Sequence, residues 1–575
     1  MRIRAAVVGS GPNGLTAACL LARRGWEVTV YESGPAPGGA LRSADLFGEG
    51  VLSDLGASAH PFGAASPAFR ALELSTQGLE WVHPPIPAAH GADGGAPPVL
   101  LRPSLEETAA GLGRDAKVWR RLVGPLAEHW EAVSQAALTP PVRPFEALTT
   151  HSLRHQDGEL TGRVSGPLRA GAGWGSDGCE AAGRLAGFAR LGVGGGWPAS
   201  MLMRVLREER SRALFSGLAA HAAVPLNQPV TGAFGLIFAA AAHTTGWPVA
   251  RGGSQAIADA LVADLEAHGG RIETDFHVEA LRETSLDSGR RGVRKDLKHR
   301  GWRIDGRVRG AGDGEAAGPS SGKRLSPQAR GGAGTANTGR RRSSQEAADV
   351  VLLDLTPKQV LELEGLRLPA RYARRLRRWD YGMGVVKVDF LLEEPIPWRH
   401  QEMSGAGTVH LGGSHGQILA SESAASRGVL PGRPYVLLVQ PAAADASRGR
   451  DGRTACWAYA HVPHGLSGEG ARRASQLIEA EIEAQAPGFG EVVSARKVWG
   501  AEELEGWNPN LVGGSISGGA PTLNQFLARP AMSFTPYATG ADGVFLCSSS
   551  TPPAPGVHGM SGFHAAHAAL RDVEG

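Results

Sequence analysis

The fold is decided near the amino terminus by the stretch Ala5-Ala-Val-Val-Gly9-Ser10-Gly11-Pro12-Asn13-Gly14. Its four apolar residues, 5–8, have the length and composition of a short buried strand. The apolar pattern that follows predicts a helix from about residue 13 to residue 24, and Gly25 is placed to end it. The stretch therefore predicts a strand, a glycine-rich turn and a helix in succession.

Each glycine of this turn has a physical role in binding a dinucleotide. Gly9 permits the tight turn, Gly11 lets backbone N–H groups approach a pyrophosphate, and Gly14 lets the helix pack closely on the sheet. The positive end of the helix dipole then faces the two phosphate charges. The alternative is an incidental glycine turn in a purely structural βαβ unit.

An acidic residue supports the nucleotide interpretation. The next predicted strand, residues 27–31, ends at Glu32, which lies about 20 residues beyond Gly11, where an acid that binds the ribose is expected. A carboxylate at this position hydrogen-bonds ribose hydroxyls and repels a 2′-phosphate, so NADP is disfavoured.

A second glycine motif carries a resemblance to a known family. The segment Pro35-Ala-Pro-Gly38-Gly39-Ala-Leu-Arg42-Ser43 resembles the second flavin motif, usually PGGR, of the phytoene desaturase and amine oxidase superfamily. The resemblance implies that the two glycines let the loop pass close to FAD and its diphosphate. It also implies that Arg42, displaced from the usual arginine position, adds positive charge there.

Two later segments extend the resemblance. The segment Trp247-Pro-Val-Ala-Arg-Gly-Gly-Ser254 precedes a predicted helix capped by Ser254 and short strands at 271–274 and 277–281. In the superfamily the chain re-enters the flavin domain here, which implies a backbone contact of Val278 with the adenine. A strand at 543–547, a turn and a helix at 557–571 resemble the last flavin element, whose helix N-terminus stabilises the charge of reduced flavin.

The resemblance covers about residues 4–570, and within the superfamily the chain looks most like the phytoene dehydrogenase-related proteins, in the pyridine nucleotide-disulphide oxidoreductase domain-containing protein 2 group. The supporting motifs include the segments at 508–519 and 547–553. Cys19, Cys179, Cys456 and Cys547 are far apart and form no CxxC pair. We therefore expect neither a structural zinc site nor the redox disulfide that the group's name implies.

The expected fold class is α/β, with a Rossmann-like, glutathione-reductase-type FAD-binding domain and an interleaved α+β substrate domain. The FAD-binding domain comprises residues 1–75, 246–357 and 531–575. Residues 285–347 contain few large apolar residues and are interpreted as a disordered insertion in a surface hairpin. The substrate domain comprises residues 76–245 and 358–530.

Several elements of the substrate domain are predicted individually. Ser104 begins a capping box, and a helix is expected from there to about residue 129, with Trp119 on a face that packs in the core or lines a lipophilic site. Residues 384–391 and 454–461 alternate as in an antiparallel sheet covered on one face. Lys387 is expected to form a salt bridge or be exposed rather than to act near a flavin.

Histidines near the expected flavin were considered as metal ligands. His558, His564 and His567 have no acid or cysteine nearby in sequence, so no metal site is expected. His567 is expected to pack, and His60 and His558 either border the flavin or are structural histidines.

Composition restricts the class of protein. With 42% hydrophobic and 20% charged residues and a net charge of +3, the chain has a large core and no global basic field for nucleic acid. No apolar run reaches the roughly 18 residues of a membrane span, while peripheral membrane contact and the oligomeric state stay open. We expect no cleavable leader ahead of residue 5, and the cysteine usage suits a cytoplasmic location.

These observations predict an FAD-dependent oxidoreductase of the phytoene dehydrogenase type that takes hydride from an apolar substrate, such as a polyene including carotenoids, or from an amine. The alternative is a flavin-binding scaffold without turnover, and an NAD-dependent dehydrogenase is disfavoured because the carboxyl-terminal flavin helix would have no purpose. No catalytic side chain is identified. The residues expected to bind FAD are Gly9, Ser10, Gly11, Pro12, Asn13, Gly14, Glu32, Ser33, Gly38, Gly39, Arg42, Val278, Gly556, Val557, His558, Gly559 and Met560.

Overall fold

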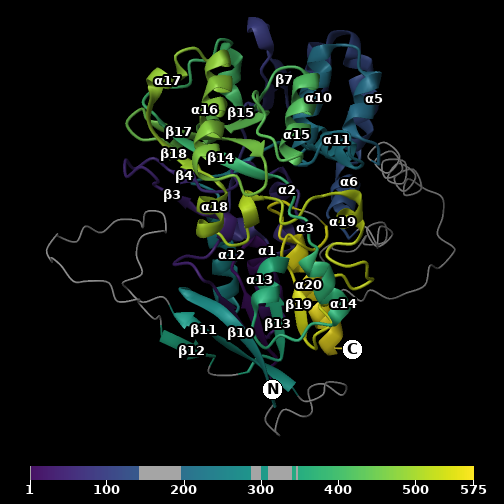
Figure 1. Cartoon of the computed structure of the whole chain (residues 1–575), viewed down its shortest axis with the longest axis vertical. Helices are drawn as coiled ribbons and strands as arrows, with labels where there is room; N and C mark the ends of the chain where they lie inside the picture. The colour runs from purple at the N-terminus through teal and green to yellow at the C-terminus, as the bar shows by residue number, and fades with distance from the viewer. Residues whose placement is uncertain are drawn as a thin grey trace, which may run out of the picture.

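The computed structural model describes residues 2–140, 196–285, 300–308, 340–344, 347–553 and 555–574. Figure 1 shows two lobes, with the chain termini at the lower lobe and the helices α5, α10 and α16 in the upper one.

A five-stranded parallel sheet forms the centre of the lower lobe, in the order β19-β13-β1-β2-β9. Its strands are β1 (Arg4–Val8), β2 (Glu27–Tyr31), β9 (Arg271–Glu273), β13 (Val350–Leu353) and β19 (Val544–Leu546). Segments far apart in the sequence thus share one sheet, which confirms the Rossmann-like α/β fold class built from discontinuous segments. All five strands begin and end within about two residues of their predicted positions.

Alternate residues of β13 show that this sheet has layers on both faces. Val350 and Leu352 pack with helices α1 (Pro12–Arg23), α12 (Gln255–Ala267) and α20 (Met560–Glu574). Val351 and Leu353 pack on the other face, against an antiparallel sheet of β10 (Phe276–Ser285), β11 (Arg300–Val308) and β12 (Arg340–Ser343). Both faces are buried, as is usual for parallel sheets.

The prediction that residues 285–347 form a disordered insertion is wrong for β11 and β12. Trp302 and Ile304 of β11 are 3% and 1% exposed and belong to the core above β13. Apolar and polar residues do alternate over a short stretch around Trp302. The glycine-rich and arginine-rich segments on either side obscured this strand pattern. Residues 286–299 and 309–339 lie outside the described residues.

The upper lobe contains a seven-stranded mixed sheet in the order β18-β14-β17-β16-β15-β6-β7. The strands are β6 (Ile86–His90), β7 (Val99–Leu101), β14 (Gly384–Leu392), β15 (Ala406–Leu411), β16 (Val436–Val439), β17 (Thr454–Val462) and β18 (Val493–Trp499). All pairs are antiparallel except β15 with β6.

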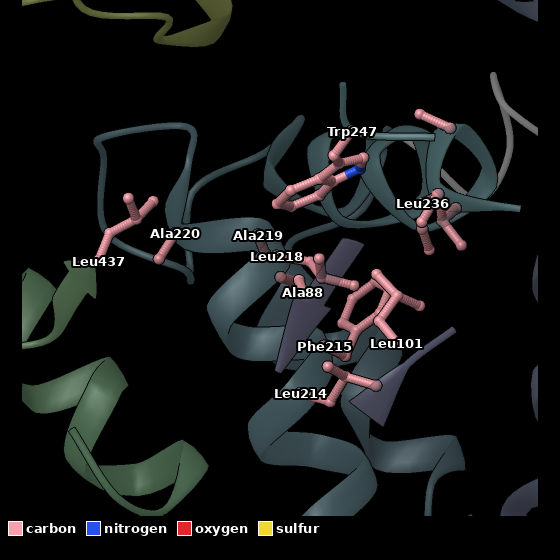
Figure 2. Close-up of a cluster of buried hydrophobic side chains, with 14 of the residues drawn as sticks. Ala88, Leu101, Leu214, Phe215, Leu218, Ala219, Ala220, Leu236, Trp247 and Leu437 are labelled. Atoms are coloured by element: carbon pink, nitrogen blue, oxygen red, sulfur yellow. The ribbon is translucent and has the colours of Figure 1, made fainter. Parts of the chain in front are cut away.

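Both faces of this sheet are covered, so the prediction of a single covered face is wrong. Every residue of β14 is buried: Val386 and Phe390 pack with α16 (Gly468–Gln485), and Val385 faces the opposite core. That opposite core includes α10 (Glu209–Ala220) and α11 (Thr231–Ala242). Figure 2 shows Phe215 and Leu218 of α10 beside Leu101 and Ala88 of the sheet edge.

The single helix expected from residue 104 to 129 is also a misprediction. The structure has α4 (Leu105–Gly111), α5 (Ala116–Glu128) and α6 (Trp130–Ala137). Ser104 does accept a hydrogen bond from the Glu107 N–H, but the chain turns at Gly113, whose φ is +57°. Trp119 is fully buried in the core, which confirms its packing role.

The other α-helices and strands lie outside the two large sheets. They are α2 (Pro61–Ala64), α3 (Pro67–Ala71), α9 (Ala199–Leu202), α13 (Pro357–Glu362), α14 (Ala370–Arg377), α15 (His415–Ser426), α17 (Phe489–Val492), α18 (Ala501–Trp507), α19 (Leu523–Leu527), β3 (Ser43–Ala44), β4 (Ser53–Asp54), β5 (Trp81–Val82) and β8 (Val249–Ala250). Among the described residues, none of the helices combines the length and apolarity required to traverse a bilayer.

Candidate cofactor and substrate site

The glycine loop after β1 leaves no space for side chains at two of its glycines. Gly9 has a φ of +97°, and a Cβ on it would lie 3.0 Å from the Asp354 carbonyl oxygen. A Cβ on Gly14 would lie 2.2 Å from the carbonyl oxygen of Gly9. The tight turn and the close approach of α1 therefore both require glycine, as the motif predicts.

The second glycine motif lies directly against this loop. Gly38 has a φ of +122° and donates its N–H to the Ser10 carbonyl oxygen at 3.0 Å. A Cβ on Gly39 would lie 3.1 Å from the Cα of Gly11. The structure thus brings together the two loops that the sequence assigned to one cofactor.

Glu32 points back to the glycine loop from the end of β2. Its carboxylate accepts hydrogen bonds from the Ser10 N–H at 3.0 Å and the Gly34 N–H at 2.7 Å. Ser33 lies beside it, and its hydroxyl is 3.4 Å from the same carboxylate. Burial lowers the pKa of Arg42, while the Glu32 charge opposes that shift. Arg42 Nε has no hydrogen-bond partner among the described residues, and its guanidinium lies over the Trp507 ring.

The predicted contact of Val278 with the adenine stays a prediction, although the strand that carries Val278 begins beside Glu32. The start of β10 is fastened to the acid-bearing turn, since Phe276 donates its N–H to the Glu32 carbonyl oxygen at 2.8 Å. Val278 itself is 7% exposed and packs in the core above β13.

The carboxyl-terminal helix begins three residues later than predicted, at Met560 rather than residue 557. Gly559, with a φ of +66°, cannot continue a helix, and His558 Nδ1 accepts the Met560 N–H at 3.0 Å. A Cβ on Gly562 would lie 1.8 Å from the Asn13 carbonyl oxygen. The N-termini of α20 and α1 therefore meet, and both point positive dipole ends into the same region.

Comparison with known proteins agrees with this geometry. A family model described as an NAD(P)-binding Rossmann-like domain matches residues 7–73. Pyridine nucleotide-disulfide oxidoreductase domain-containing protein 2 from Rattus norvegicus is 25% identical over 353 residues, which are 57% of this chain and 52% of the relative. The Mus musculus protein of the same name is 28% identical over 247 residues, 39% of this chain and 40% of the relative. The chain thus spans about half the length of these curated relatives.

Solved structures share the whole fold at low identity. An oxidoreductase from Methanosarcina mazei is 13% identical with a TM-score of 0.54, over 99% of this chain and 100% of that one. Wild-type putrescine oxidase bound to putrescine is 14% identical with a TM-score of 0.54, over 100% of this chain and 98% of that one. These likenesses show that the chain shares the fold of these solved structures.

Asp354 lies beside the glycine loop, and sequence reasoning did not identify it as part of the site. It follows β13, the strand next to β1, and is 5% exposed. Its Oδ2 accepts the Gly14 N–H at 3.0 Å. Burial raises the pKa of Asp354 to about 7, with Glu32 adding to the increase and hydrogen bonds from Gly14 and Gly11 opposing it. One sequence signal could have identified Asp354: it lies at the carboxyl end of a parallel strand, where such sheets bind ligands.

Buried polar contacts join Lys387 and Arg448 to Asp54 in the loop that follows the second glycine motif. Lys387 Nζ lies 2.6 Å from the Asp389 carboxylate and 3.2 Å from the Asp54 carbonyl oxygen. Lys387 is 4% exposed, so its predicted salt bridge is confirmed and the alternative of exposure is wrong. Arg448 pairs with the Asp54 carboxylate. Although burial acts in the opposite direction, Arg448 and several hydrogen bonds hold the pKa of Asp54 below its usual range.

Aromatic rings form one side of the region between α10, α11 and the upper sheet. Phe62, just after the Asp54 loop, lies 5.2 Å from Phe238 of α11 between ring centroids. Phe238 contacts His221 at 4.5 Å, and His221 Nε2 lies 3.0 Å from Nε2 of His410. Burial lowers the pKa of His221 to about 3 and that of His410 well below its usual range, so both are neutral at pH 7.

Aromatic residues of the upper sheet form the other side of this region, and one of them contacts the Asp54 loop. Tyr435 contacts His461 at 6.2 Å, and Tyr459 contacts both His461 and Trp457. Trp457 Nε1 donates to the Ser58 hydroxyl at 2.8 Å. Both groups of aromatic residues therefore contact the segment that follows the second glycine motif, through Phe62 and Ser58. These histidines lie far apart in the sequence, and only the fold brings them together.

Three further histidines have partners within the described part of the chain. His60 Nε2 lies 2.8 Å from the Ser254 hydroxyl, which donates to the Ala57 carbonyl oxygen; Ser254 therefore does not cap α12 with its side chain as predicted. His567 lies 4.5 Å from Phe563 between ring centroids, as expected for a packed ring. His564 hydrogen-bonds the Leu138 carbonyl oxygen. In the described part of the chain, acids, cysteines and histidines form no cluster that could hold a metal ion.

Proposed function

We propose that this chain is an FAD-dependent oxidoreductase that removes hydride from an apolar substrate. The observation that carries the proposal is the meeting of three segments: the glycine loop at Gly11, the second motif at Gly39 and the N-terminus of α20. A cradle in which a Cβ on Gly39 would touch Gly11 suits a cofactor that extends past both loops.

Each segment would hold a different part of FAD. The N–H groups of Gly11 and Asn13 would bind the diphosphate, and Glu32 would accept hydrogen bonds from the ribose hydroxyls. Arg42, with its buried unpartnered Nε, would add positive charge. When bound, FAD supplies the hydride acceptor, and the chain supplies orientation and electrostatic stabilisation.

The N-terminus of α20 would serve the flavin ring. The positive dipole end of this helix stabilises negative charge, which is what a reduced flavin carries. The Met560 N–H is already held by His558 Nδ1, so His558 would fix the direction of this helix end rather than take part in chemistry. We assign no side chain as an acid or base.

The substrate would lie between the upper sheet and α10 with α11. This side of the sheet is lined by apolar and aromatic residues such as Leu437, Trp247 and Phe238, part of which Figure 2 shows. An apolar wall favours a lipophilic compound, either a polyene or an amine with a large apolar part. The same proposal includes the domain boundaries given above. It also includes a cytoplasmic location, which the free buried cysteines Cys19, Cys456 and Cys547 support.

Reconstitution with FAD tests the proposal directly. We expect purified protein incubated with FAD and desalted to keep stoichiometric flavin, seen in its absorbance and in the extract of denatured protein. Protein that retains no flavin would refute the proposal. The alternative, a flavin-binding scaffold without turnover, differs in redox behaviour: an enzyme's flavin is photoreduced and reoxidises quickly in air, whereas a structural flavin does neither.

A further inference from the structure

The carboxylate of Asp354 accepts hydrogen bonds from backbone N–H groups that a diphosphate would also use. Helix α1 begins at Pro12, which has no N–H, so the donors at its start are Gly11, Asn13 and Gly14. Asp354 accepts the Gly14 N–H at 3.0 Å, and it also receives a backbone hydrogen bond from Gly11. A Cβ on Gly11 would lie 2.5 Å from Asp354 Oδ2. The side chain thus occupies the anion-binding end of α1.

The charges that face Asp354 do not neutralise it. Glu32, from the end of β2, is a second acid. Cys547, from the end of β19, has its pKa raised by burial and by the Asp354 charge. Asn510 is neutral, and its side-chain amide donates to the carbonyl oxygen of Asp354 at 3.0 Å. In the part of the chain that the structure describes, no lysine or arginine pairs with the Asp354 carboxylate.

A bound diphosphate would bring two fixed negative charges to this buried place. Like charges at close range in a poorly solvated region disfavour each other's ionisation, which raises the pKa of the group that can take up a proton. A neutral Asp354 also gains an O–H donor that a phosphate oxygen can accept. Its pKa of about 7 without any ligand places this proton exchange in an accessible range.

Resting on the proposed function, we propose that Asp354 is a cofactor-binding residue that takes up one proton from solvent when the diphosphate of FAD occupies the glycine loop. In the free protein the ionised carboxylate holds the α1 donors; in the complex the neutral acid shares them with the diphosphate. Affinity for FAD therefore falls as pH rises above about 7, by up to about tenfold per pH unit, because binding then requires one more proton than the free protein holds.

The test is FAD binding by flavin-free protein, followed by fluorescence from about pH 6 to about pH 9, a range in which the FAD diphosphate does not titrate. Calorimetry in two buffers of different ionisation enthalpy counts the protons taken up. We expect close to one proton per FAD at the alkaline end for the wild type. Asp354→Asn is expected to bind with a nearly pH-independent Kd and to take up no proton.

Asp349→Asn is the matched control, because Asp349 lies just before the same strand β13 and binds the Arg4 N–H, away from the glycine loop. It is expected to keep the pH dependence of the wild type. A wild type that binds FAD without proton uptake, or an Asp354→Asn variant that keeps the pH dependence, would overturn the inference. The wild-type proton count decides the matter even if Asp354→Asn does not fold. Absence of FAD binding at every pH would instead refute the proposed function.

Discussion

The imidazole of His461 and the carboxylate of Glu422 are joined by a hydrogen bond of 2.8 Å between Nδ1 and Oε2, although their side chains are 1% and 0% exposed. His461 Nε2 and Glu422 Oε1 have no further partner among the described residues. A buried pair of this kind makes each member depend on the other, because either one alone would be an uncompensated polar or charged group.

Glu422→Ala should therefore lower the free energy of unfolding by about 3 kcal/mol or more. Urea denaturation of the flavin-free protein measures this change. Glu80→Ala is the control, since Glu80 pairs with Arg251 on the surface, where solvent screening leaves such pairs little effect on stability. Equal effects of the two substitutions would show that the Glu422–His461 pair is not a buried unit.

Gly11→Val is expected to abolish FAD retention. The added Cβ would lie 2.5 Å from Asp354 Oδ2, so the loop or the carboxylate must move from its present position. Flavin absorbance after reconstitution and desalting measures the loss. Gly111→Ala should retain FAD like the wild type, because a Cβ there would meet nothing within 4 Å. Stoichiometric FAD in folded Gly11→Val protein would contradict the placement of the diphosphate.

Trp302→Ala should lower the free energy of unfolding by about 3–5 kcal/mol, the usual cost of removing a buried tryptophan side chain. Trp302 is 3% exposed and its Nε1 donates to the Asp542 carbonyl oxygen at 2.9 Å. Denaturant unfolding checks this, with the exposed neighbour Arg303→Ala as a control. Deletion of all of 285–347 would remove β11 and is likewise expected to destabilise the protein. A neutral Trp302→Ala would mean that β11 does not contribute to the core.

Acid should destabilise the folded state through its buried histidines. Burial lowers the pKa of His221 to about 3 and of His60 to about 4, against about 6.5 in an unfolded chain. Between about pH 6.5 and pH 4 the unfolded state binds more protons, so stability falls as pH falls through this window. Melting temperatures across the window measure the slope.

His221→Gln should flatten that slope, because glutamine can still hydrogen-bond His410 but does not titrate. His277→Gln, at an exposed position of β10, should leave the slope as in the wild type. An unchanged slope in His221→Gln would show that His221 is protonated in the folded state.

Lipophilic compounds should bleach the flavin under anaerobic conditions. We expect reduction by a polyene, a retinoid-like compound or an amine with a large apolar part, and none by small polar acids, sugars or nucleotides, because the wall formed by α10 and α11 is apolar. The absorbance of the oxidised flavin is the readout. Fast bleaching by a small hydroxy acid alone would contradict the substrate class and leave FAD binding intact.

Local signals in the sequence predicted much of the nucleotide-type fold. The glycines at 9, 11 and 14 and the acid at 32 have fixed spacings because they act within one βαβ unit. Asp354 could not be assigned in the same way, since its role depends on β13 lying next to β1, a neighbour more than 300 residues away. Ser254 likewise looked like a cap, yet its hydroxyl is taken by Ala57 from another segment.

The contact of Gly562 with Asn13 has a consequence for biosynthesis. The segment around Asn13 leaves the ribosome long before β19 and α20 exist, so the apolar face that α1 turns toward α20 has no cover while the intervening chain is made. The packing of α20 against α1 can consequently form only after synthesis has passed residue 562.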